Sequence, residues 1–101
     1  MKLGLLTVMF SGKPLKEVLE MVAPLGLECV ELGTGNYPGS AHCPLDELLA
    51  SKPKRDELKA LIKGNGLEIS ALSCHGNCLH PDTAFAKANQ MVQTKTIKLA
   101  K

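Results

Sequence analysis

The feature that most constrains this chain is the regular alternation of short apolar runs with amphipathic stretches. Apolar runs occupy residues 3–8, 27–32 and 67–72, and turn-forming Gly, Ser or Asn follows each of them. Apolar residues recur at helical spacing in residues 15–25, 45–49 and 58–62, and again from about Thr83 to Lys101. This order predicts an α/β fold with a parallel sheet, because parallel strands need helical crossovers between them.

Residues with known terminal preferences indicate where the helices begin and end. Pro14 and Pro53 suit a first helical turn, and Asp82 is placed to cap the last helix. The cluster at residues 64–66, Gly-Asn-Gly, stops the third helix. We expect the last helix to present an apolar side made of Phe85, Ala88, Met91, Val92 and Leu99.

Composition excludes several classes of protein. The 101 residues suffice for one domain, and 45% apolar against 22% charged residues excludes an intrinsically disordered chain. One Tyr, two Phe and no Trp provide little surface for stacking bases. The net charge of +2 gives no strong field for nucleic acid or an anionic membrane. We therefore expect neither partner.

The N-terminus and the cysteines bear on location. No apolar run reaches the roughly 20 residues that cross a bilayer. Lys2 followed by residues 3–10 has the outline of a signal peptide, but no small-x-small cleavage site follows, which favours a first strand. We expect a cytoplasmic protein whose four cysteines are free thiols.

Reactive side chains gather after the second and third expected strands. One following loop holds Asn36, Tyr37, His42 and Cys43, and the other, residues 73–80, reads Ser-Cys-His-Gly-Asn-Cys-Leu-His. In parallel α/β folds the functional site forms at the carboxyl ends of the strands. The sequence therefore predicts a site at this end of the sheet.

Glu31 and His75 are the candidate catalytic residues. Glu31 shares a strand face with Cys29 and Gly33. If the sheet belongs to a barrel and this face points inward, the carboxylate is buried and needs a His, a metal or a substrate hydroxyl beside it. Alternatively, Glu31 caps a helix or faces water. His75 can donate a hydrogen bond, carry a proton or bind a metal, or it can simply stabilise its own loop. We expect the two side chains to lie close together.

Asn36, Asn77 and His80 are the candidate substrate-binding residues on these loops. His80 precedes Pro81, which holds its backbone extended and favours a plain loop role.

The cysteines allow a second interpretation, a zinc site. Cys74 and Cys78 have a spacing found in zinc loops, and His42 with Cys43 would supply the other ligands.

Four stretches resemble the N-terminal part of bacterial sugar phosphate isomerase/epimerase proteins: LDELL at 45–49, KRDEL at 54–58, GLEISALSCHGN at 66–77 and LHP at 79–81. Residues 3–5 and 30–33 also fit. These proteins have the xylose isomerase-like TIM barrel, a fold shared with endonuclease-four-type abasic-site nucleases. The resemblance covers essentially the whole chain but only about three of the eight barrel units. It implies that residues 1–101 form a single partial TIM-barrel domain.

The resemblance implies a sugar isomerase or epimerase of carbohydrate metabolism that acts on a sugar or sugar phosphate and could form a homo-oligomer at full length. A divalent metal ion (Mn, Mg, Co or Zn) would polarise the substrate while a carboxylate moves a proton. Glu31 and His75 match strand-end positions near the family's active-site mouth. The metal ligands of such barrels mostly come from later strands, so we expect no metal bound by this fragment and no turnover from it alone.

Two alternatives remain open: an abasic-site nuclease of the same fold with His75 as a zinc ligand, and a small zinc- or partner-binding module. For the barrel fragment we expect parallel strands in order 1-2-3 with helices on one side. We also expect poor stability, with apolar residues such as Val30 and Leu72 exposed at open sheet edges.

Overall fold

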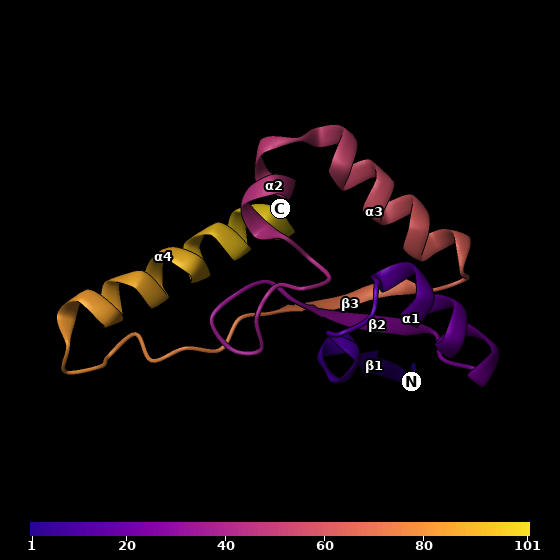
Figure 1. Ribbon diagram of the computed structural model, residues 1–101, viewed down its shortest axis with the longest axis horizontal. Helices are drawn as coiled ribbons and strands as arrows, with labels where there is room; N and C mark the ends of the chain where they lie inside the picture. The colour runs from indigo at the N-terminus through magenta and orange to yellow at the C-terminus, as the bar shows by residue number, and fades with distance from the viewer.

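The computed structural model describes all of residues 1–101 and contains the predicted alternation of strands and helices (Figure 1). Three parallel strands form one sheet in sequence order: β1 (Gly4–Leu6), β2 (Cys29–Gly33) and β3 (Glu68–Ser73). Four α-helices follow them: α1 (Leu15–Val22), α2 (Leu45–Ala50), α3 (Lys52–Gly64) and α4 (Thr83–Ala100). Two short 3-10 turns, η1 (Thr7–Phe10) and η2 (Ala23–Leu25), complete the set. The α/β class and the strand order 1-2-3 are confirmed.

Local sequence accounts for most element boundaries. Asp82 caps α4, since its Oδ1 accepts the backbone N–H groups of Ala84 and Phe85 at 2.9 and 3.2 Å. Ser51 caps α3 by accepting the N–H of Lys54 at 3.4 Å. The first strand is shorter than residues 3–8 because the chain turns into η1 after Leu6.

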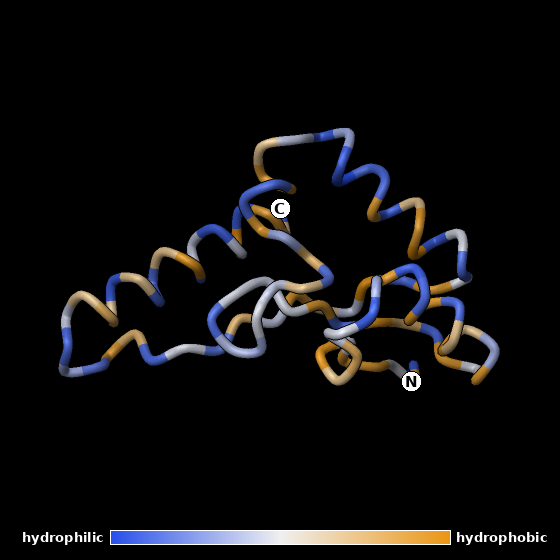
Figure 2. The backbone as a smooth tube through the Cα atoms, in the orientation of Figure 1, coloured by the Kyte–Doolittle hydropathy of each residue, from blue (hydrophilic) through white to orange (hydrophobic).

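The core lies on one face of the sheet. Val30 and Leu32 of β2 are fully buried there, against side chains from three helices: Val18, Leu19 and Val22 of α1, Leu48 of α2, and Ile62 of α3. Leu99 of α4 packs on the same cluster, so the helices meet the sheet from one side, as predicted. The predicted exposure of Val30 is wrong, because it occupies the helix-facing side of the central strand; Leu72 is half-buried. Figure 2 shows the apolar character of these segments.

Helix α4 buries a different face from the one predicted. Its buried residues are Ala86, Asn89 and Thr96, whereas Phe85 and Met91 are 50% and 57% exposed. Close backbone contact explains the difference: a Cβ on Gly76 would lie 2.1 Å from Asn89 Oδ1. Such an approach leaves room only for small or hydrogen-bonding groups. The predicted apolar side is therefore wrong for Phe85, Ala88 and Met91, and right in part for the half-buried Val92 and Leu99.

Helix α4 also gives the molecule its elongated shape, 45 × 27 × 26 Å. It begins well beyond the carboxyl end of the sheet and returns toward α2 (Figure 1). Lys95 of α4 forms an ion pair with Asp46 of α2 at 2.7 Å. None of the helices combines the length and the apolarity that crossing a membrane requires.

Candidate functional site

Three side chains at the carboxyl ends of β2 and β3 form a hydrogen-bonded chain. Ser73 lies opposite Gly33 in the sheet register, so it shares a sheet face with Glu31. The Ser73 hydroxyl is hydrogen-bonded to Glu31 Oε1 and lies 3.1 Å from His75 Nε2. The structure thus brings the two predicted catalytic residues together through one bridging hydroxyl.

The direction of these bonds follows from the single proton of a hydroxyl. Glu31 as a carboxylate only accepts, so Ser73 donates to it and must accept from the Nε2–H of His75. In the neutral ring, Nδ1 is then the acceptor nitrogen. Ser73 is buried, Glu31 is half-buried and His75 is exposed, so these hydrogen bonds run from the sheet outward to solvent.

The backbone of the loop after β2 holds His75 in place. Tyr37 and His75 exchange two backbone hydrogen bonds, of 3.0 and 2.7 Å. The N–H of Thr34 donates to the Ser73 carbonyl at 2.9 Å, which extends the pairing to the strand end. The Tyr37 ring lies beside His75, with 6.4 Å between ring centroids, and it is largely exposed. The site therefore combines a fixed imidazole with an open aromatic surface.

The predicted substrate-binding residue Asn36 lies next to this site but is engaged elsewhere. Its amide Nδ2 donates to the carbonyl of Asn89 at 3.3 Å and contacts Cys74 Sγ at 3.5 Å. Its backbone has a φ of 49°, in the left-handed region that Asn tolerates better than most residues. Asn36 thus ties the loop to α4.

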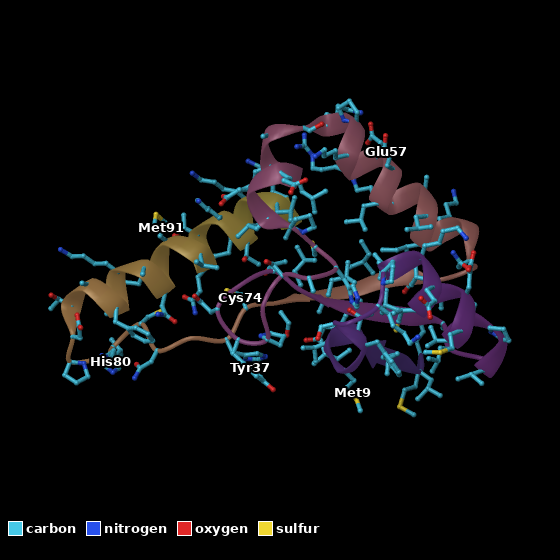
Figure 3. The ribbon with its side chains drawn as sticks, in the orientation of Figure 1. Met9, Tyr37, Glu57, Cys74, His80 and Met91 are labelled. Carbon is cyan, nitrogen blue, oxygen red and sulfur yellow. The ribbon has the colours of Figure 1, made fainter.

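Asn77 and His80 make contacts local to their own loop. Asn77 Oδ1 accepts the N–H of Leu79 at 3.1 Å. His80 Nδ1 accepts the N–H of Asp82 at 3.0 Å, and its ring packs on Phe85 with centroids 4.6 Å apart. In Figure 3, His80 lies near the start of α4, well away from Tyr37 and Cys74. The structure does not bring His80 to the Glu31–Ser73–His75 chain.

The structure does not bring together the four residues of the zinc interpretation, Cys74, Cys78, His42 and Cys43. Cys43 is fully buried in the core, and desolvation raises the pKa of its thiol to about 11. His42 is buried separately, with Nε2 at 2.8 Å from the Lys13 carbonyl. No three His, Cys, Asp or Glu side chains gather closely enough to hold a metal ion.

Ser73 is the site residue that the sequence did not single out. A signal was available in the period of two along a strand, which places Ser73 and His75 on the same side once residues 68–73 are read as β3. The pairing of Gly33 with Ser73 places Ser73 on the same sheet face as Glu31. This pairing depends on the register between strands, which no local pattern specifies.

Comparison with known proteins gives one informative similarity. No protein-family model matches the sequence. The uncharacterized protein YfiH of Bacillus subtilis (strain 168) is 34% identical over 100 residues. The aligned region covers 99% of this chain but only 32% of YfiH, so the chain spans about a third of the length of that relative.

Proposed function

We propose that this chain forms the first three strand–helix units of a xylose isomerase-like TIM barrel and carries part of the active site of a sugar or sugar phosphate isomerase or epimerase. The observation that carries the proposal is the Glu31–Ser73–His75 chain at the carboxyl end of a parallel sheet. Catalytic groups of TIM barrels come from this end of several strands. The sheet order 1-2-3 is also the order of consecutive barrel strands.

The two faces of the sheet support the same proposal. Helices cover one face, and the other carries small or polar residues at Gly4, Glu31, Gly33 and Ser73. In a barrel, that second face lines the interior. The relative that this chain resembles is about 310 residues long by the shared fraction, within the range of a TIM barrel with insertions.

The hydrogen-bonded chain supplies a proton acceptor with a fixed orientation. Ser73 holds the His75 ring by Nε2–H, and Nδ1 is left to accept a hydrogen bond from a substrate hydroxyl. If that hydroxyl gives up its proton, the positive ring is stabilised through Ser73 by the Glu31 carboxylate. The Tyr37 ring beside it suits the apolar C–H face of a sugar. In this proposal Glu31 orients, and His75 touches substrate.

The resemblance also implies a divalent cation, which would polarise the substrate carbonyl when bound. The residues of this chain do not fit such a centre. No three potential ligands come together, and Glu31 Oε1 already accepts from Ser73. We therefore assign no metal ligand in residues 1–101.

The experiment uses the full-length relative as host. This chain replaces the 100 aligned residues of YfiH, and both YfiH and the chimera are incubated with aldoses, ketoses and their phosphates in D₂O with Mn²⁺, Mg²⁺, Co²⁺ or Zn²⁺. An isomerase or epimerase that moves a carbon-bound proton through a side chain exchanges it with solvent, so deuterium should appear in the sugar, as detected by NMR. His75→Ala in the chimera should lower the exchange rate by about 10²–10⁴-fold.

The matched control is His80→Ala, which removes an imidazole from the same loop but leaves the Glu31–Ser73–His75 chain intact. We expect a change of less than about threefold, within the range of a surface substitution. Cleavage of a duplex with an abasic site, without deuterium exchange in any sugar, would show that the nuclease alternative is right. An unchanged rate in His75→Ala would show that His75 only orders its loop.

A further inference from the structure

Asn36 has an unusual backbone conformation for a residue with a side chain. Its φ of 49° lies in the left-handed region, where a side chain is crowded against the backbone. Asn tolerates this region better than most residues do, but a glycine would adopt it without steric cost. Two glycines of the same loop, Gly35 and Gly39, do have positive φ values. The side chain of Asn36 must therefore contribute contacts that a glycine would lack.

The Asn36 amide contacts residues on both sides of His75. Its Nδ2 lies 3.5 Å from Cys74 Sγ, and a Cβ on Gly76 would lie 2.7 Å from the same nitrogen. The next residue along the loop, Tyr37, exchanges two backbone hydrogen bonds with His75. The two neighbouring loop residues therefore contact three successive residues after β3, and the imidazole is on the middle one.

Helix α4 also approaches Gly76 closely. A Cβ there would lie 2.1 Å from Asn89 Oδ1. Asn89 is 6% exposed and its Nδ2 donates to the Phe85 carbonyl at 2.9 Å, so its amide is not free to move aside. The Asn89 carbonyl in turn accepts the Asn36 amide at 3.3 Å. Gly76 does not have a positive φ, so the close approach of the two amides explains this glycine.

These contacts hold the backbone beneath an exposed ring. His75 is exposed to solvent, so its backbone, more than packing of its ring, determines where the imidazole lies. The distance from His75 Nε2 to Ser73 Oγ is 3.1 Å, close to the upper limit of a good hydrogen bond. A small shift of the backbone at residues 74–76 would therefore break the hydrogen bond that orients the ring.

We propose that Asn36 is a positioning residue of the candidate site. Its amide, held by Asn89, fixes the backbone on both sides of His75 and keeps the ring within hydrogen-bonding distance of Ser73. In this role Asn36 acts through His75, in place of the substrate contact that the sequence predicts. The inference rests on the proposed function of His75 as the group that accepts a proton from the substrate. Loss of the amide should therefore lower kcat and leave KM nearly unchanged.

The first measurement needs no sugar turnover. In the 101-residue chain, NMR detects a nuclear Overhauser contact between the β protons of Ser73 and the carbon-bound protons of the His75 ring. Asn36→Gly keeps the positive φ and removes the amide, and we expect this contact to lose at least about half of its intensity. Asn36→Asp also tolerates the φ but cannot donate to the Asn89 carbonyl, so it should have the same effect.

The second measurement uses the chimera with YfiH and its deuterium exchange. Asn36→Gly should lower kcat for exchange by about 10–10²-fold, because a small misplacement of a reacting group has an effect of this size. KM should change by less than about threefold. A raised KM with an unchanged Overhauser contact would show that Asn36 binds substrate directly, and would overturn the positioning role.

The matched control is Asn65→Gly. Asn65 lies at the end of α3, at the opposite end of β3 from the site, and its Nδ2 donates to the Leu61 carbonyl at 2.9 Å. Both variants lose an amide hydrogen bond and should lower the urea midpoint to a similar extent, but Asn65→Gly should keep the Overhauser contact and kcat.

Equal effects of Asn36→Gly and Asn65→Gly on kcat, or an unchanged Overhauser contact in Asn36→Gly, overturn the proposal. If neither YfiH nor the chimera exchanges deuterium into any sugar, the proposed function fails. The Overhauser contact then still decides whether Asn36 positions His75.

Discussion

Strands β2 and β3 are neighbours of similar composition, but their side chains are buried to different extents. Val30 of β2 and Ile69 of β3 are register partners, yet Val30 is fully buried and Ile69 is 36% exposed. The central strand has a partner on each side and helices over one face, whereas β3 has one partner and a free edge. The comparison shows that position in the sheet, more than the apolar character of a run, decides how far a strand is buried.

The candidate site depends on the pairing of these two strands. The Glu31–Ser73–His75 chain spans both strands at their carboxyl ends, where backbone pairing with Tyr37 holds it.

The largest expected effect comes from Leu32 and Leu72, which are also register partners. Leu32→Ala removes a fully buried side chain and should lower the free energy of unfolding by about 2–5 kcal/mol. Leu72→Ala should cost about half as much, because Leu72 is only half-buried. Urea unfolding followed by circular dichroism measures both. Equal losses would mean that β3 is covered in solution and that the two strands are buried to the same extent.

The second effect is a pH dependence of stability that comes from a buried side chain, Cys43. Burial raises the pKa of Cys43 from an ordinary value of 9.0 to about 11. Between these values the folded protein binds one proton more than the unfolded chain, so stability falls as pH rises. The loss should be on the order of 2–3 kcal/mol. Unfolding curves at pH 8 to 11 measure it.

The control for this pH dependence is Cys43→Ala, which should lower stability at every pH but remove the extra fall between pH 9 and 11. Cys78 offers a second check, because it is half-buried and its Sγ donates to Gln93. A thiol reagent at pH 8 should modify Cys78 in the folded protein and reach Cys43 only on unfolding. Fast modification of Cys43 in the native state would contradict its assignment to the core.

The smallest effect should come from changing the register partners to the same residue. Ile69→Thr places a hydroxyl at the exposed edge and should change stability by less than about 0.5 kcal/mol. Val30→Thr buries the same hydroxyl without a partner and should cost about 1–3 kcal/mol. Thermal unfolding of the two variants gives the ratio of the two losses in stability. A ratio near one would show that the two positions have the same surroundings.

The sequence predicts the elements well and the faces less well. Asp82 and the Gly-Asn-Gly cluster mark helix ends because capping is a contact within a few residues. The prediction of the buried face of α4 was wrong for Phe85 and Met91. Hydropathy ranks side chains without reference to the surface that packs against them. The surface opposite is the backbone near Gly35 and Gly76, which admits Asn89 and Val92 instead.

For the candidate site, the sequence by itself determined which chemical groups follow the strands: a carboxylate at Glu31, an imidazole at His75, and the loops that carry them. Strand alternation and the preference of function for strand ends are sufficient for that. Only the tertiary structure decided that Ser73 bridges the two groups and that Cys43 lies in the core. The reason is that these outcomes depend on the register between strands and on contacts between residues far apart in the chain. Both are set by how the helices and sheet pack, and no local pattern contains that information.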